Sequence, residues 1–286
     1  EIRNWKNLSD VSLVAPQLWF HSHHRIKALD EAVGRVDFRA MSLGSLLDEK
    51  TGGGARYYVE NVFEALEPGE FYLDRPAGRL YYMPLEGEAP DKSEVVAPRL
   101  PAVVAFLGTR QRNVAHVRLE DVAIRYAEWD YAPDDPGSIQ ASFKIPGAVI
   151  LEHAVHCGLV GCEVSAGAPY GIEARSGCHR LLIAGCHVHD MGAGGIRVGH
   201  DWMKDIRETS LHRTPPRPDG KPMAVTVSDC VIHACGRLFP SGMGVWVGNA
   251  GGNRIVHNHI YDLPHTGISC GWSWGYGPSG AHHNVI

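Results

Sequence analysis

The stretch HVHDMGAGGIRVG, at residues 187–199, has the pattern of a strand, a glycine-rich turn and a second strand, and it decides the fold because it recurs. A close parallel, HIYDLPHTGISCG, occupies residues 259–271. Both stretches place an Asp five residues before a Gly-Ile pair, with an apolar residue two positions before the Asp. A short β unit that returns with its turn in the same place is typical of a repeat protein.

Five segments of the chain align in register on this unit. They are LEDVAIRY (119–126), LVGCEVSA (159–166), IAGCHVHD (183–190), VSDCVIHA (227–234) and IVHNHIYD (255–262). Each has an apolar residue at its first and sixth positions, and successive segments begin 40, 24, 44 and 28 residues apart. A base period of about two dozen residues, with short strands and no helical periodicity, predicts a solenoid of parallel strands, which is a parallel β-helix.

The first hundred residues do not repeat in this way. We therefore predict an all-β chain with an N-terminal β-rich module at residues 1–100 and a parallel β-helix at residues 101–286. Within the module, GEFYLDRPAGRLYYMP (69–84) alternates aromatic and branched residues around a Pro-Ala-Gly turn, which predicts a hairpin.

In such a solenoid, residues at the same position of successive units stack about 4.8 Å apart. The fourth position of the five segments predicts an internal ladder of Val122, Cys162, Cys186, Cys230 and Asn258. The eighth position predicts a column of Tyr126, Ala166, Asp190, Ala234 and Asp262 at the turn. The ladder accounts for three of the seven cysteines, and the lack of a CxxC pair predicts mostly free, buried thiols.

Composition and charge narrow the classes of partner. The 286-residue chain has a net charge of -5, and its Lys and Arg residues are scattered, so no basic patch for nucleic acid is expected. It has no apolar run of the roughly 18 residues that a membrane span needs, so we predict no membrane partner. Glycine, at 33 residues, implies many tight turns and favours β architecture.

The two Asp residues of the column are the candidate catalytic groups. Asp190 and Asp262 lie two coils apart, which puts their backbones roughly 9 to 10 Å apart. Glycoside hydrolysis generally uses two carboxyl groups, separated by about 6.5 to 9.5 Å in inverting enzymes. The small Ala166 and Ala234 on neighbouring coils would leave room for a sugar ring. An Asp at such a turn can equally serve only to accept backbone N–H bonds.

A second column follows one strand later. It contains Glu173, Arg197, Trp246 and Ser269, and we interpret it as the floor of a substrate-binding groove. Trp246 and Trp272 could stack on sugar faces, although tryptophans in such patterns are often part of a core. Asp201 lies in a long polar insert (200–222), and loops on a rigid scaffold commonly carry binding groups.

Histidines cluster near both ends of the chain, in FHSHHR (20–25) and AHHN (281–284). His21 and His23 would share one face of a strand, with His24 on the other. No third ligand stands at a recognisable spacing, so we predict no metal site and no cofactor, and we assign these histidines no role.

Four stretches, ARYYVENVFEALEPGEFYLDRPAGRLYYMP (55–84), GAGGIRVG (192–199), FPSGMGVWVG (239–248) and HNHIYDLPHTGISCGWSWGYGP (257–278), together resemble bacterial right-handed parallel β-helix carbohydrate-active enzymes. Within that superfamily the sequence is most similar to glycoside hydrolase family 141, of the fucosidase and xylanase type. The resemblance implies a right-handed helix and a secreted or periplasmic hydrolase of plant or algal polysaccharide. It also implies a catalytic Asp pair, one matching Asp262 and its partner on a later coil.

Because this chain stops at Ile286, we expect the solenoid to be truncated and the partner acid to lie beyond that residue. An open solenoid end exposes unpaired strand edges, through which two copies could associate.

Two other functions remain open. A polysaccharide lyase on the same fold would need a Ca²⁺ site or a basic residue beside a uronate, and Arg197 and Arg175 are the candidates. A non-catalytic or truncated β-helix would bind polysaccharide or oligosaccharide and release nothing.

Overall fold

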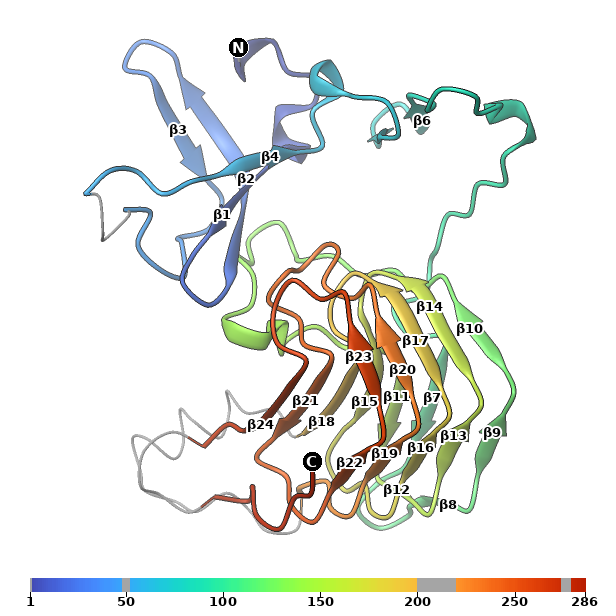
Figure 1. Cartoon of the computed structure of the whole chain (residues 1–286). Coiled ribbons are helices and arrows are strands. Elements are labelled where there is room, and N and C mark those ends of the chain that lie inside the picture. Colours follow the sequence, from blue (N-terminus) through green and yellow to red (C-terminus); the bar gives the residue numbers. More distant parts are fainter. Residues whose placement is uncertain (1, 48–51, 200–219, 274–278) are drawn as a thin grey trace. The chain divides into compact units, whose positions relative to one another are not determined.

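The computed structural model of the chain describes residues 2–47, 52–199, 220–273 and 279–286 (Figure 1). The chain forms two compact units. The N-terminal unit comprises residues 1–96 together with 131–139, and the β-helix unit comprises residues 97–130 and 140–286. Among the described residues, no helix is long and apolar enough to cross a membrane.

The N-terminal unit is built on an antiparallel sheet with the strand order β3-β2-β1-β4. Its strands are β1 (Ser12–Pro16), β2 (His21–Asp30), β3 (Arg35–Phe38) and β4 (Tyr58–Glu60). Short 3-10 turns accompany them at Ile2–Asn4, Leu8–Asp10, Phe63–Ala65 and Pro90–Lys92. Val11, Ile26 and Val62 form the small buried core of this unit.

A separate hairpin belongs to the same unit. Strand β5 (Phe71–Asp74) pairs antiparallel with β6 (Arg79–Tyr82), in the stretch where the sequence predicts a hairpin. The connecting turn ends at Gly78, whose φ of 62° lies in the left-handed region that glycine adopts without a Cβ clash.

The β-helix unit consists of three long parallel sheets, to which each coil contributes one strand. Sheet one is formed by β7 (Val104–Leu107), β11 (Gly147–Glu152), β15 (Tyr170–Ala174), β18 (Ile196–Gly199), β21 (Val245–Gly248) and β24 (Ile268–Gly271). Sheet two is formed by β9 (Arg118–Glu120), β13 (Gly158–Val160), β16 (Leu182–Ala184), β19 (Thr226–Ser228) and β22 (Arg254–Val256). Sheet three is formed by β10 (Ala123–Arg125), β14 (Glu163–Gly167), β17 (His187–Met191), β20 (Val231–His233) and β23 (His259–Tyr261).

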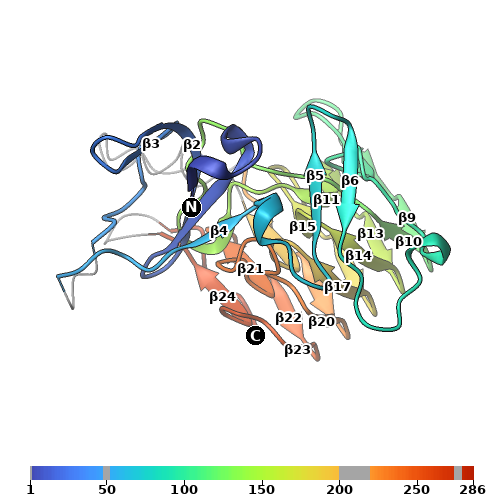
Figure 2. The same cartoon turned by 90° about the horizontal axis from the view of Figure 1, so that it is seen from above.

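Successive coils stack along one axis, so strands from distant parts of the sequence lie side by side (Figures 1 and 2). A short parallel pair, β8 (Val114–Ala115) and β12 (Ala154–Val155), supplements the sheets in the first coils. The all-β class and the parallel β-helix predicted from the sequence are thus confirmed.

The corners on either side of sheet three explain much of the repeat. Both the third and the eighth positions of the aligned segments have positive φ. The third position is Asp121, Gly161, Gly185, Asp229 and His257, with φ between 54° and 62°; the eighth is Tyr126, Ala166, Asp190, Ala234 and Asp262, with φ between 49° and 63°. Glycine, Asp and His are among the residues that tolerate the left-handed region best, and they occupy the whole third position, whereas the eighth position also carries Tyr and Ala.

The interior ladder runs between sheets two and three. Cys162, Cys186 and Cys230 are each 1% exposed, which confirms their predicted place. Asn258 ends this stack, because its Oδ1 accepts from the Cys230 backbone N–H and its Nδ2 donates to the Val227 carbonyl, both at 3.0 Å. Val122 keeps the register but is 40% exposed, since β10 is the edge strand of the sheet; its predicted interior place is wrong.

The thiols are free, as predicted. Cys270 is exposed and the other six are buried. Burial raises the pKa of the Cys178 thiol to about 12, so this residue is unreactive in the folded chain.

Candidate functional site on the outer face of sheet three

Sheet three presents alternate residues to the interior and to the outside. At the sixth position, Val164, Val188 and Ile232 are fully buried, so the fifth and seventh positions point outward. The outward residues, which we call the sheet-three face, are Ala123, Glu163, His187, Val231 and His259 in the fifth row and Arg125, Ser165, His189, His233 and Tyr261 in the seventh. The face is therefore mostly polar and rich in flat rings.

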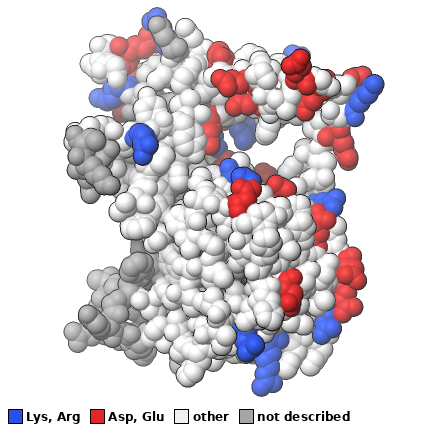
Figure 3. All heavy atoms as spheres, in the orientation of Figure 1, with Lys and Arg blue, Asp and Glu red and all other residues white. Residues whose placement is uncertain are grey.

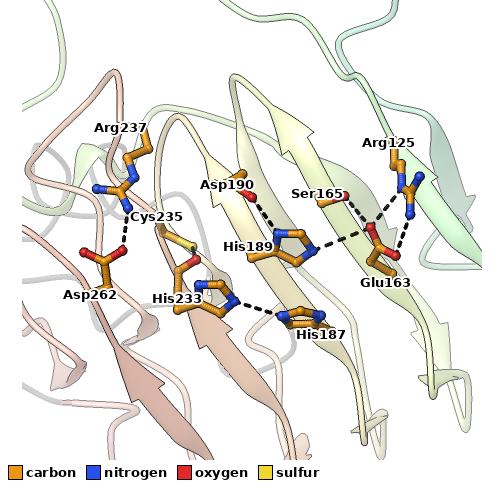
Figure 4. Close-up of polar contacts among 10 residues, drawn as sticks. All are labelled: Arg125, Glu163, Ser165, His187, His189, Asp190, His233, Cys235, Arg237 and Asp262. Atoms are coloured by element: carbon orange, nitrogen blue, oxygen red, sulfur yellow. Dashed lines mark hydrogen bonds and ion pairs between the residues drawn. The ribbon is translucent and has the colours of Figure 1, made fainter. Parts of the chain in front are cut away.

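Three histidines converge at the centre of this face (Figure 4). The Nε2 atoms of His187 and His233 are 2.9 Å apart. His189 holds the Asp190 carboxylate through its Nδ1 atom at 2.7 Å. Desolvation lowers the pKa of His187, and the neighbouring His189 and His233 lower it further, so neutral imidazole is favoured.

An ion pair borders the histidines on one side. The Glu163 carboxylate accepts from Arg125 Nε and Nη2 at 2.9 and 2.7 Å and from the Ser165 hydroxyl at 2.7 Å. These bonds, with Arg125 the largest contributor, lower the pKa of Glu163 to about 2, so the carboxylate stays charged. Its Oε1 is 3.5 Å from His189 Nε2.

Asp190 and Asp262 occupy the same column, as predicted. Ala234 lies between them, because it follows the His233 partner of His189 and its N–H donates to the Asp262 carbonyl. Both carboxylates are exposed, and Asp262 pairs with Arg237 Nη2 at 2.5 Å (Figure 4). Their φ angles of 50° and 49° give each Asp a backbone role as well. Ala166 is exposed, but Ala234 is 5% exposed, so the open space predicted above it is wrong.

The second predicted column exists, but most of it is covered. Glu173, Arg197, Trp246 and Ser269 pair in register across sheet one. The first three are 1%, 6% and 0% exposed. Their interpretation as an open groove floor is wrong, because all three are buried; the segment before β11 contacts Arg197, which donates to the carbonyls of Phe143 and Ile145.

Within this buried column, Glu173 is the central acceptor. It accepts from Arg197 at 2.8 Å, from Arg175 at 2.9 Å and from the Gly147 N–H at 2.9 Å. Desolvation raises the pKa of Glu173, but the charges and hydrogen bonds of Arg197 and Arg175 outweigh it and the net shift is downward. Geometry thus favours a structural ion pair, and a sugar-binding role for these residues stays a prediction.

Three predicted site residues remain, and the histidines that were assigned no role lie in the N-terminal unit. Ser269 is half-buried and accepts from Trp272 Nε1 at 3.1 Å, and the Trp272 ring packs against Trp246 at 5.5 Å between ring centroids. Asp201 lies outside the described residues. In the N-terminal unit, His24 is buried against Phe38, and desolvation lowers the pKa of His23 to about 4.

The sequence reading did not select the residues that dominate the sheet-three face. His187, His189, His233 and Tyr261 all stand at the fifth or seventh positions of the aligned segments, visible in CHVHD, CVIHA and NHIYD. The fifth and seventh positions both point outward and carry His or Tyr in several segments, so this pattern could have been recognised in the sequence.

Known proteins resemble this chain mainly in fold. The family described as "Right handed beta helix region" matches residues 147–274, which confirms the predicted handedness. A solved structure titled "Glycoside hydrolase" superposes with a TM-score of 0.77 at 19% identity, covering 99% of this chain and 54% of that one. The chain therefore spans about half the length of that structure.

Another solved structure, the Azotobacter vinelandii mannuronan C-5 epimerase AlgE4 A-module, has a TM-score of 0.37 at 13% identity, covering 61% of this chain and 46% of that one. No curated protein matches the sequence significantly. The membership of glycoside hydrolase family 141 stays a prediction.

Proposed function

We propose that this chain is a carbohydrate-active protein that hydrolyses glycosidic bonds in plant or algal polysaccharide on its sheet-three face. The observation that carries the proposal is the exposed pair Asp190 and Asp262, held in one column two coils apart. At about 4.8 Å per coil, the pair has a backbone separation of about 10 Å, and side-chain rotation can bring the carboxyl groups within the range of about 6.5 to 9.5 Å used in inversion.

The two carboxyl groups would divide the work of an inverting mechanism. One protonates the oxygen of the leaving sugar, and the other removes a proton from a water on the opposite face of the sugar ring. Asp262 is our first candidate and Asp190 the second. Arg237 and His189, which contact these carboxylates, hold them in place and can donate to sugar hydroxyls.

A ladder of flat rings beside the carboxylates supports glycan binding. His189 and His233 stack at 5.3 Å with a 6° angle, and His233 and Tyr261 stack at 4.7 Å with a 9° angle. The ladder runs along the helix axis next to the Asp column, so an extended chain of sugars would contact both. His233 is stacked between the other two rings, so the ladder offers ring edges and their polar atoms, including the Tyr261 hydroxyl, to the hydroxyl groups of a sugar.

Substitution of Asp by Asn tests the proposal without disturbing the corners, because Asn also tolerates positive φ. Sugar release from a panel of plant and algal polysaccharides and aryl glycosides is compared for the unchanged chain, Asp262→Asn and Asp190→Asn. Asp229→Asn is the matched control, since Asp229 is an exposed Asp with φ 56° at the other corner.

We expect Asp262→Asn to lose about 10²- to 10⁴-fold in rate, the usual worth of general acid–base catalysis, and Asp229→Asn to lose none. Equal loss in Asp190→Asn identifies it as the partner acid. Full activity of Asp190→Asn instead places the partner on a later coil, as the resemblance to family 141 implies. Undiminished release by Asp262→Asn contradicts the proposal.

Arg237, which contacts Asp262, and the ring side chains of the sheet-three face favour a polysaccharide lyase as the second candidate. Arg237 could neutralise a uronate carboxylate, and Tyr261 or His233 could remove or return the proton. Lyase products carry a new double bond that absorbs ultraviolet light, whereas hydrolysis products do not. Glycan binding without either product identifies a non-catalytic binding protein.

A further inference from the structure

The histidine cluster of the sheet-three face has the composition and spacing of a metal site. Among the described residues, His187, His189 and His233 form a group whose ligand nitrogens all lie within 4.8 Å of one another. We propose that these three imidazoles bind a late first-row divalent transition metal, of which Zn²⁺ is the best match. Imidazole nitrogen suits Zn²⁺, Cu²⁺, Ni²⁺ and Fe²⁺, whereas Ca²⁺ and Mg²⁺ prefer oxygen ligands.

The fold fixes the relative positions of the three rings. His187 and His189 are two residues apart on β17 and therefore point the same way, and His233 is the parallel partner of His189 on β20. Zn–N bonds of about 2.0–2.1 Å place two ligand nitrogens of a tetrahedral site about 3.4 Å apart. The 2.9 Å between the Nε2 atoms of His187 and His233 is close to this spacing, and His189 needs only a rotation of its side chain.

Asp190 supplies the outer contact that such sites use. A metal-bound histidine usually donates its second ring N–H to a carboxylate, which fixes the tautomer and makes the ligating nitrogen more basic. His189 Nδ1 is 2.7 Å from Asp190 Oδ2 and its Nε2 atom is 3.5 Å from Glu163 Oε1, so Nε2 is the nitrogen available to a metal and reaches His187 and His233 once the side chain turns away from Glu163. Asp190 is therefore a positioning residue of the proposed site.

The charges around the cluster favour a cation. Glu163 and Asp190 each contribute a negative charge, and Arg125, which is held by Glu163, contributes one positive charge. His187 is exposed and the other two histidines are half-buried. Three protein nitrogens on an accessible surface leave further coordination positions for water or for an oxygen of a ligand.

Metal binding is measured directly with Co²⁺ and Zn²⁺, without a glycan, so its outcome is independent of the proposed hydrolysis. The full chain, freed of metal with a chelator, is titrated with Co²⁺, whose visible absorption reports nitrogen ligation, and with Zn²⁺ by calorimetry. The variants are His187→Asn, His233→Asn and Asp190→Asn. His259→Asn is the matched control, because His259 is an exposed ring on the same face outside the cluster.

We expect one Co²⁺ per chain with an intense visible band that Zn²⁺ displaces. The band should disappear in His187→Asn and His233→Asn, Asp190→Asn should weaken binding about 10- to 100-fold, and His259→Asn should bind normally. Circular dichroism and the melting temperature establish that each variant is folded. Absence of binding to the unchanged chain overturns the proposal, as does a band that survives in both His187→Asn and His233→Asn.

Discussion

Replacing Glu173 by Gln tests whether the covered column of sheet one is structural. Glu173 is 1% exposed and accepts hydrogen bonds from Arg197, Arg175 and the Gly147 N–H. Gln keeps the volume and one carbonyl oxygen, but it removes the negative charge. Arg197, which is 6% exposed, then keeps only neutral carbonyl acceptors for its buried positive charge.

Breaking a buried ion pair by removing one partner costs about 3–5 kcal/mol. Gln has nearly the same shape as Glu, and Arg197 keeps its carbonyl partners. We therefore expect Glu173→Gln to lower the free energy of unfolding by about 3 kcal/mol, near the lower limit. Glu120→Gln is the matched control, because Glu120 pairs with Arg118 at 3.2 Å but both side chains are more than half exposed. Exposed pairs of this kind contribute about 0–1 kcal/mol.

The assay is urea denaturation of both variants and the unchanged chain at pH 7, followed by circular dichroism. A free energy of unfolding for Glu173→Gln within about 0.5 kcal/mol of the unchanged chain, which is the usual range for surface substitutions, would refute the structural reading. Glu173 would then again be a candidate sugar-binding residue.

The same variant has a defined pH dependence. The pKa of Glu173 is lowered from 4.5 in the folded chain, so its contribution to stability is complete above about pH 4.5 and is lost as the pH falls through the folded pKa. The stability difference between the unchanged chain and Glu173→Gln should therefore shrink in acid. A difference that grows as the pH falls below 4.5 contradicts this sign.

One further substitution and one labelling reaction test the interior of the solenoid. Asn258→Ala removes the hydrogen bonds to the Cys230 N–H and the Val227 carbonyl. At about 0.5–1.5 kcal/mol for each bond, the free energy of unfolding measured in urea should fall by about 1–3 kcal/mol. A loss well below that range would show that water replaces both bonds. In thiol labelling of the native chain, Cys270 should react alone, and the six buried thiols should react only after denaturation. Rapid native labelling of more than one thiol would contradict the burial of the other six cysteines.

The features predicted best from the sequence are those that repeat. The fourth-position cysteines and the Asp column follow from counting residues within one coil, because parallel strands stack equal positions on one another. The left-handed corners were also within reach of the sequence. Asp, Gly and His recur at the third position, where only the backbone conformation requires them.

The sequence does not show which residues are buried or which segments of the same chain contact them. The alternation of sheet one predicts the register of Glu173, Arg197 and Trp246, but it does not reveal that they are buried or that the segment before β11 contacts Arg197. Residues 131–139 belong to the N-terminal unit although they lie within the span of the β-helix, which no local pattern indicates. The convergence of His187, His189 and His233 needs the pairing of two strands that lie more than forty residues apart.

The charged side chains on one face of the molecule are dispersed. On the face drawn in Figure 3, Lys, Arg, Asp and Glu are interspersed among wide uncharged areas. A neutral polysaccharide would therefore be held by contacts with ring side chains and by hydrogen bonds rather than by a field of one sign.

The central claim is that glycan binds the sheet-three face, and hydroxyl-radical footprinting locates that contact directly. The Asp262→Asn variant is labelled with and without the polysaccharide that it binds, so that turnover does not remove the ligand, and modified His and Tyr side chains are quantified by mass spectrometry. We predict that glycan protects His233 and Tyr261, while His257, which is 84% exposed at another corner, is labelled equally in both samples. Glycan binding that leaves His233 and Tyr261 unprotected would contradict the account.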